Sequence, residues 1–458
     1  MKCKVTLGKA PSLAMPVDSG GAWKTVYGVG MPFQVSPTQA AVIVNRRIYN
    51  VAAIDFEDGG DLLVFDSLER LDPAAAVPLS RTETAVDPAT GQRVAMVSYQ
   101  SAGGFVPLGA KLEDGSPHPA AGTGFALSTH IAYPQDPATG RVLRPSAENA
   151  SHQRILQLRY DGHAVRVTGS RQFAGEDFLP GHALLNRGIS VAIPDGADLL
   201  NGVVAGPMVP AGGPDGVCIP TEHPHGHPRF GRNLGSALCR WQHRDGVWGP
   251  SAIVPVSGPD LSMEPSLVRD ADGSLLMAVR GKGLKDPPGA VHDGLENTFC
   301  HFRVSRSVDG GRTWAPVLHV PLARAATPVV LNRTAGGHPF LAANPYTRDR
   351  RRETLCLWPL TPDRRGVEPP VCALDALARF GAPQPMVAGG VESGNQWMLD
   401  HPVATVCRLG DGRWHCLLCL RVSDRGVNTA GAAPTEWNGA WIGEVAVEGE
   451  RELPVWRF

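Results

Sequence analysis

The sequence has no run of the roughly 18 apolar residues that a membrane-spanning helix needs. It also has almost no net charge, because 43 Lys and Arg face 44 Asp and Glu. Long runs of one charge, which are typical of chains that bind nucleic acid or anionic membranes, are missing too. We therefore expect neither nucleic acid nor a membrane as a partner.

The first residues, MKCKVTLGKAPSLAMP, lack the apolar stretch of a signal peptide. This start predicts a cytoplasmic protein if Met1 is native, and a secreted or periplasmic one if a signal peptide was removed.

Cysteine is scarce, with nine residues, and several lie inside apolar, strand-like runs. An odd number in such positions favours buried free thiols over a disulfide framework. Cys416 and Cys419 form a CxxC pattern within WHCLLCLR, but this stretch is typical of a strand, which would direct the two side chains apart. We expect no metal there.

Helical periodicity is also scarce, with LDALARF at 374–380 as the clearest short helix, whereas 53 Gly and 41 Pro punctuate the whole chain. An apolar strand, an acidic Gly turn and a second apolar strand recur with centres near 58, 113, 196, 272, 336 and 411. Repeats of one β-unit are typical of propellers and solenoids. The sequence predicts one all-β domain over 1–458, a six-bladed β-propeller in which residues 1–40 complete the last blade. Seven blades would require a further hairpin.

The stretch SVDGGRTW at 307–314 combines turn residues with one bulky anchor. It matches the Asp-box, S-x-D-x-G-x-T-W, and the chain resembles the sialidase superfamily of BNR-repeat propellers through Ser307, Asp309, Gly311, Thr313 and Trp314. We expect this stretch to be a turn between the outer strands of a blade, with an architectural and not a catalytic role.

The resemblance implies a catalytic glutamate before the first strand of the preceding hairpin and a substrate-binding arginine at the end of its second strand. In MEPSLVRDADGSLLMAVR these positions hold Glu264 and Arg280. Both side chains would then face the axis of the ring.

The same resemblance implies further arginines that grip a carboxylate, and a general acid. NRRIYNVAAIDFEDGGDLLVF places Arg47 at the first arginine position, although Tyr49 stands where the family has proline. Asp72 is the nearest candidate for the acid. The R-x-x-L pattern after the Asp-box selects Arg352, with Arg351 next. Several guanidinium groups around one carboxylate imply an anionic sugar.

The family's tyrosine nucleophile has no counterpart before the last hairpin. The chain reads WMLDHPVATVCRLGDGRWHC, so His401 stands at the tyrosine's place, beside Asp400. A histidine can act as general acid or base near neutral pH. His401 is therefore a candidate catalytic residue, and a histidine that only hydrogen-bonds to Asp400 is the alternative.

Two further segments hold candidate substrate-binding residues. TEHPHGHPRFGRN carries three alternating histidines that could meet a metal, but prolines and a glycine interrupt it, so we expect a loop over the pocket and no metal. EDFLPGHALLNRG leads into an inner strand. The candidates from these segments are His182, Arg187, His227 and Arg232.

Three functions remain open at this point. The first is a sialidase-like glycoside hydrolase that acts on an acidic or unusual sugar of a glycan, without a cofactor. The second is a polysaccharide lyase on the same fold, with His401 as the base that acts on a uronate. The third is a carbohydrate-binding propeller without turnover.

Overall fold

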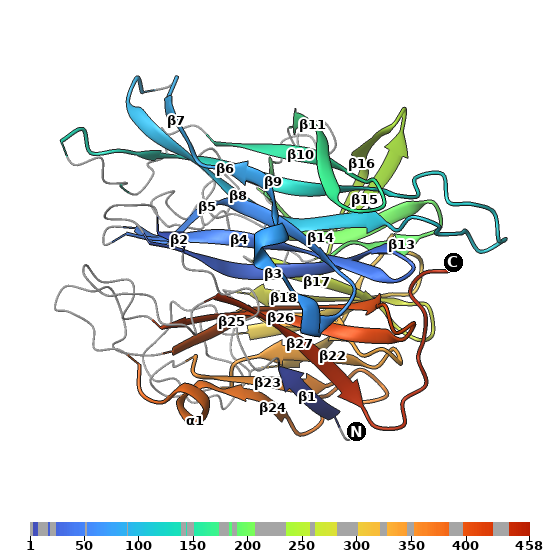
Figure 1. Ribbon diagram of the computed structural model, residues 1–458. Coiled ribbons are helices and arrows are strands. Elements are labelled where there is room, and N and C mark those ends of the chain that lie inside the picture. The colour runs from blue at the N-terminus through green and yellow to red at the C-terminus, as the bar shows by residue number, and fades with distance from the viewer. Residues whose placement is uncertain are drawn as a thin grey trace, which may run out of the picture.

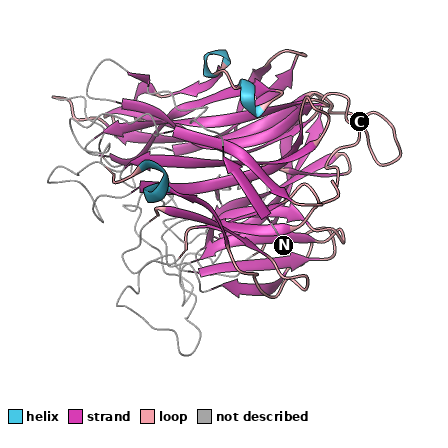
Figure 2. Ribbon diagram, turned by 60° about the horizontal axis from the view of Figure 1, so that its bottom comes forward, coloured by secondary structure: helices cyan, strands magenta, loops and turns pink. Residues whose placement is uncertain are grey.

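Short antiparallel strands make up almost all of the regular structure in a computed structural model of the chain (Figures 1 and 2). The regular helical elements among the described residues are 3-10 turns η1 (Leu68–Arg70) and η2 (Pro73–Ala75) and helix α1 (Ala376–Phe380), which lies within the predicted 374–380. None of these is long enough to cross a membrane. The described residues are 3–7, 17–18, 24–50, 53–88, 90–138, 143, 151–173, 183–185, 190–206, 235–256, 262–281, 301–320, 328–345, 352–383, 397–424 and 439–458.

The strands of the first half pair into sheets of five. One sheet has the order β2 (Val17–Asp18), β3 (Lys24–Ser36), β4 (Gln39–Asn50), β5 (Ala53–Phe65), β6 (Val77–Arg81). The next has the order β11 (Val165–Phe173), β10 (Ser151–Tyr160), β9 (Thr123–Pro134), β8 (Arg93–Val106), β7 (Glu83–Val86). A third joins β12 (Ala183–Leu185), β14 (Asp198–Gly206), β15 (Gly235–Arg244) and β16 (Val247–Pro255), with β13 (Ile193–Asp195) also paired to β14.

The second half forms sheets of four strands. One consists of β17 (Ser262–Arg269), β18 (Leu275–Gly281), β19 (His301–Ser307) and β20 (Ala315–Val320). Another consists of β21 (Val330–Arg333), β22 (Pro339–Ala343), β23 (Thr354–Pro359) and β24 (Val371–Asp375). In the last, β25 (Trp397–Arg408), β26 (Trp414–Asp424) and β27 (Gly439–Val447) are joined by β1 (Cys3–Leu7). Of the segment 1–40, β1 thus lies in the last sheet, whereas β2 and β3 belong to the sheet of β4.

One strand from each sheet contacts the corresponding strand of the next, in the cyclic order β3, β8, β14, β17, β21, β25 and back to β3. Buried polar side chains join these inner strands. Oγ of Ser266 accepts a hydrogen bond from the Leu331 amide, and Oδ1 of Asn332 accepts one from the Ala404 amide, both at 2.7 Å. These bonds fix β17 against β21 and β21 against β25.

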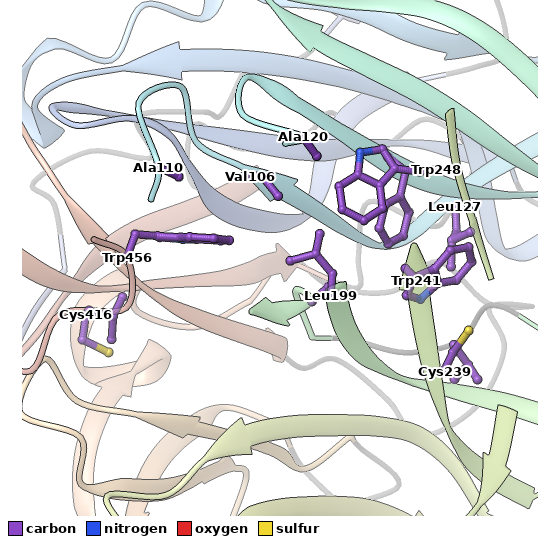
Figure 3. Close-up of a cluster of buried hydrophobic side chains, with 14 of the residues drawn as sticks. Val106, Ala110, Ala120, Leu127, Leu199, Cys239, Trp241, Trp248, Cys416 and Trp456 are labelled. Carbon is purple, nitrogen blue, oxygen red and sulfur yellow. The ribbon is translucent and has the colours of Figure 1, made fainter. Parts of the chain in front are cut away.

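Apolar side chains fill the space between neighbouring sheets. The rings of Phe125 and Trp241 stack with centroids 4.3 Å apart, and Trp248 packs against Phe125. Figure 3 shows Trp241 and Trp248 within this cluster. Every residue of β26 is buried, which explains why its sequence is a nearly continuous apolar run instead of an alternating one. Cys416 and Cys419 belong to different clusters, as a strand requires, and neither forms a disulfide within the described part of the chain.

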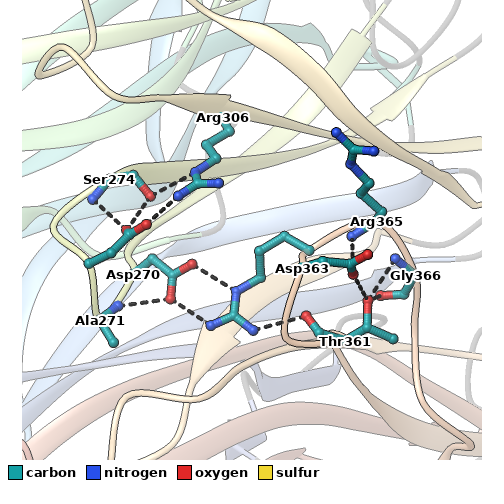
Figure 4. A network of polar contacts seen from close by, with 10 residues as sticks. Asp270, Ala271, Ser274, Arg306, Thr361, Asp363, Arg365 and Gly366 are labelled. Atoms are coloured by element: carbon teal, nitrogen blue, oxygen red, sulfur yellow. Dashed lines mark hydrogen bonds and ion pairs between the residues drawn. The ribbon is translucent and has the colours of Figure 1, made fainter.

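An ion pair between Asp270 and Arg364 also joins two neighbouring sheets. Asp270, at the turn after β17 (Figure 4), accepts two hydrogen bonds from Nε and Nη2 of Arg364 at 2.7 and 2.8 Å. Arg364 comes from the turn between β23 and β24. Asp270 is buried, so this bidentate pair holds the turns of two sheets together.

Four of the predicted hairpin centres, near 196, 272, 336 and 411, lie at the turns β13–β14, β17–β18, β21–β22 and β25–β26. The centre near 113 lies in a loop, 107–122, that connects β8 and β9. The centre near 58 is wrong, because 53–65 is one strand. In this sheet the turn between β3 and β4 is at Pro37 and Thr38. Gly59 has φ +102, and a Cβ there would lie 2.1 Å from the Ser80 carbonyl oxygen, so glycine serves a close approach of β6 and not a turn.

The stretch 307–314 is the predicted turn between the outer strands β19 and β20. Oδ1 of Asp309 accepts hydrogen bonds from the amides of Arg312 and Thr313, at 3.0 and 2.9 Å. The Thr313 hydroxyl donates to Oδ2 of Asp309 at 2.7 Å. This bond contributes most to lowering the pKa of Asp309, and the amide bonds lower it further. Oγ of Ser307 is buried and accepts a bond from the Gly311 amide at 2.9 Å.

Candidate functional site

Glu264 lies near the start of β17, at a β-bulge. The pairing with β18 shifts between Met263 and Ser266, and Glu264 takes φ +52, in the left-handed region that non-glycine residues rarely adopt. The bulge directs the side chain to Arg280, at the end of β18, whose Nη1 donates to Oε2 at 2.8 Å. Both side chains are buried, so the two charges compensate each other in a medium of low polarity.

His401 lies at a corresponding bulge near the start of β25. The pairing with β26 shifts between Asp400 and Val403, and His401 takes φ +49. Its Nδ1 lies 3.0 Å from Oδ1 of Asp400, and its Nε2 lies 3.9 Å from Oε1 of Glu264. Two strained backbone positions on different sheets thus bring an imidazole and a carboxylate together, which is typical of functional sites.

Asp400 is fully buried and is held by two arginines. Arg421, its cross-strand partner on β26, donates from Nε and Nη2 at 2.6 Å each. Nη1 of Arg352 donates to Oδ2 at 2.5 Å. These charge-assisted bonds are of the strong, bidentate kind that fixes a side chain in one orientation.

Backbone contacts place Arg352 beside β25. Its carbonyl oxygen accepts a hydrogen bond from the Leu399 amide at 2.9 Å, and it forms a parallel bridge with Met398. Nδ2 of Asn344 reinforces this contact by donating to the carbonyl oxygens of Leu399 and Thr354, at 2.8 and 2.7 Å.

The cluster of Glu264, Arg280, Arg352, Asp400, His401 and Arg421, which we call the inner-end cluster, has three guanidinium groups and two carboxyl groups. Burial by itself lowers the pKa of His401, but the charge of Asp400, its hydrogen bond and the charge of Glu264 together raise that pKa above the usual value. Arg352 opposes this rise. The imidazole therefore keeps its proton to a higher pH than a free histidine.

The structure brings Glu264, Arg280, Arg352 and His401 together, as the sequence predicts. Arg47 lies near the end of β4, the second strand of its hairpin, and its side chain lies outside the described residues. The remaining candidates fall wholly outside the described residues: His182, Arg187, His227, Arg232 and Arg351.

Asp72 does not join the cluster. It is exposed and its Oδ1 accepts a hydrogen bond from the Ala74 amide at the start of η2. It follows β5, whose last residues lie beside the β25–β26 turn, since the Asp66 carbonyl oxygen accepts from the Gly410 amide. That turn is at the opposite end of β25 from His401, so the assignment of Asp72 as the acid of this site is wrong.

Arg421 and the structural role of Asp400 are absent from the sequence-based prediction. A signal was present, because CLLCLR ends in arginine at the same position of its hairpin as LLMAVR does. Among the described side chains, no group of three or more His, Cys, Asp or Glu is arranged to hold a metal ion. The three alternating histidines at 223–227 are not among those side chains.

A cavity of about 650 Å³ lies at the other end of the inner strands. Leu267, Arg269 and Gly273, from the end of β17 and its turn, line it, whereas Glu264 is at the start of the same strand. This cavity is therefore separate from the inner-end cluster.

No protein-family model matches the chain, and no curated protein sequence matches it. Solved structures do match. A protein of unknown function from Dyadobacter fermentans is 12% identical, with a TM-score of 0.51, and the match covers 97% of this chain and 99% of that one. The intramolecular trans-sialidase of Ruminococcus gnavus, solved with oseltamivir carboxylate, is 9% identical, with a TM-score of 0.51 and 98% of each chain covered.

The fold is sialidase-like. The chain is built of small antiparallel sheets, and its match to the Ruminococcus gnavus structure, a sialidase β-propeller, extends over 98% of its length. Trypanosoma rangeli sialidase is 10% identical with a TM-score of 0.48; the match covers 98% of this chain and 59% of that protein. At these identities the likeness concerns the fold alone.

Proposed function

We propose that this chain is a glycoside hydrolase that removes an acidic sugar from a glycan, on a six-bladed propeller whose stretch 307–314 is an Asp-box. The ring of inner strands with six members supports the number of blades. The observation that carries the function is the contact between His401 and Glu264, each at a strained bulge, with buried arginines on both sides.

The charge balance supports an anionic substrate. Three guanidinium groups face two carboxylates, and a protonated His401 adds a further positive charge. A sugar carboxylate near this cluster would meet Arg280 and Arg352, and Arg47 on β4 is the proposed third contact. The residues 182, 187, 227, 232 and 351 are proposed to contact the rest of the substrate.

The raised pKa of His401 supports a role as general acid. A histidine that keeps its proton can give it to the leaving glycosidic oxygen as the bond to the anomeric carbon breaks, while Glu264 and Asp400 stabilise the imidazolium before transfer. Water then bonds to the anomeric carbon, and the proton it releases restores the imidazolium. Elimination from a uronate would require the unprotonated form as base, which the same carboxylates disfavour.

The test is product analysis on a panel of glycans that end in acidic sugars. Hydrolysis releases a saturated free sugar, elimination gives an unsaturated uronide that absorbs ultraviolet light, and a lectin gives neither. The proposal requires the saturated sugar from the unmodified protein and its loss in Glu264→Gln.

A further inference from the structure

The cavity at the end of the inner strands opposite the inner-end cluster has the volume of a small-molecule site. Its 650 Å³ falls within the ~300–1,000 Å³ of typical ligand pockets. Most inner strands contribute to its wall. The apolar part of the lining includes Phe33, Phe105, Val191, Leu267, Leu331 and Val406.

The segment 453–457 covers this cavity. The Leu453 amide donates to the Ala335 carbonyl oxygen at 2.7 Å, and the Arg457 carbonyl oxygen accepts from the Lys111 amide at 2.9 Å. Trp456 is buried in the core and lines the cavity. The segment therefore spans from the β21–β22 turn to the loop between β8 and β9.

Arg333, at the end of β21, lines the cavity and is half-buried. Its Nη2 makes one long hydrogen bond, 3.4 Å, to the Leu453 carbonyl oxygen, and among the described residues no carboxylate forms an ion pair with it. Burial lowers its pKa most and the charge of Arg269 also lowers it, whereas Cys416 and the charge of Glu450 oppose this change. A guanidinium in such surroundings is costly unless an anion approaches it.

Arg269 provides the contrast. Its Nη2 lies 2.6 Å from Oδ1 of Asp195, so its charge is already compensated within the protein. Counted over the lining, basic side chains exceed acidic ones: Lys111, Arg269, Arg333 and Arg457 against Glu113 and Asp195. The surplus is positive, and Arg333 is the half-buried basic group of the lining with which no carboxylate of the described residues forms an ion pair.

We propose that this cavity binds an amphiphilic organic anion, whose carboxylate or phosphate pairs with Arg333 and whose apolar part fills the space between Phe33, Phe105 and Val406. The site is independent of the proposed hydrolase site, since the two lie at opposite ends of the inner strands.

Titration calorimetry of the full chain tests the proposal with four probes. Octyl phosphate and octanoate carry both features and distinguish the two anionic groups. Octyl glucoside has only the apolar tail, and inorganic phosphate only the charge. We expect one of the two amphiphilic anions to bind with a Kd below about 1 mM, and both controls to bind at least about tenfold more weakly. Equal binding of octyl glucoside, or no binding of either anion, would overturn the proposal.

Two substitutions act on the two halves of the site. Arg333→Met removes the charge at similar volume, and Ala404→Phe fills cavity space from β25. Each substitution should raise the Kd of the bound amphiphilic anion at least about tenfold. Arg451→Met removes an exposed charge outside the lining and should leave Kd unchanged within twofold, as should Glu264→Gln. Unchanged binding in a folded Arg333→Met contradicts the proposal; if a variant does not fold, the comparison of probes on the unmodified protein decides.

Discussion

Nε2 of His401 lies 3.9 Å from Oε1 of Glu264, although the two residues come from strands of different sheets. The contact depends on a β-bulge and a positive φ at each residue. Bulges redirect side chains next to functional sites, and their strain persists only where the surroundings enforce it. Here the ion pairs with Arg280, Arg352 and Arg421 enforce it.

Glu264→Gln should lower kcat at least about 100-fold, because the protonated His401 loses a carboxylate that stabilises it, and proton transfer from a positioned acid contributes about this much or more. The charge of Glu264 raises the pKa of His401, so the remaining activity should have its pH profile shifted toward acid. Steady-state rates of release of the acidic sugar, measured across pH, check both the loss of kcat and the shift of the pH profile. A fully active variant would remove Glu264 from the chemistry.

Asp400→Asn should destabilise the fold by about 3–5 kcal/mol, because the buried Arg421 and the partly buried Arg352 lose their shared carboxylate. Asp66→Asn is the matched control. Asp66 pairs with Arg70 at the surface, with both side chains well exposed, and such pairs contribute about 0–1 kcal/mol. Urea unfolding of both variants measures the difference, and an equal loss in both would contradict the account of Asp400.

The stability contributed by His401 should depend on pH. Its pKa is raised in the folded protein, so its contribution is complete below the unfolded pKa of about 6.5 and is lost as pH rises through the higher folded value. The difference in unfolding free energy between the unmodified protein and His401→Gln should therefore decrease as the pH is raised from 6 to 9. A difference that grows over this range would show that burial, and not the carboxylates, dominates the pKa.

Ser307→Ala should cost about 1–3 kcal/mol of stability, because the buried Gly311 amide loses its acceptor. Val308→Ala, at a side chain that is 79% exposed, should change stability by less than about 0.5 kcal/mol. Since the turn lies between outer strands, kcat per folded molecule should remain unchanged in both. A loss of turnover in a folded Ser307→Ala would give this turn more than an architectural role.

The sequence predicts hairpins well where an Asp-Gly pair sits between two apolar runs, as at 272 and 411, because the turn chemistry and the burial pattern agree there. It fails at 58, where Gly59 permits a close approach between strands and not a turn. Periodicity cannot separate these two uses of glycine, since both need a positive φ or a missing side chain.

For the site, spacing within one hairpin predicts the pair of Glu264 and Arg280, because the register of two paired strands relates their positions directly. Asp72 fails for the opposite reason: its place depends on the direction in which β5 ends, which sequence distance does not reveal. Arg421 is missed since an arginine at the end of an apolar strand becomes meaningful only when its cross-strand partner, Asp400, is known.

We propose that His401 protonates the glycosidic oxygen of an acidic sugar during hydrolysis, and that Glu264 keeps His401 protonated. The most direct test of this proposal is the product released from a panel of glycans with terminal acidic sugars, with the unmodified protein and Glu264→Gln side by side. The account predicts a saturated acidic sugar from the first and at least about 100-fold less from the second. An unsaturated uronide, no product from any glycan, or equal release by both proteins would contradict it.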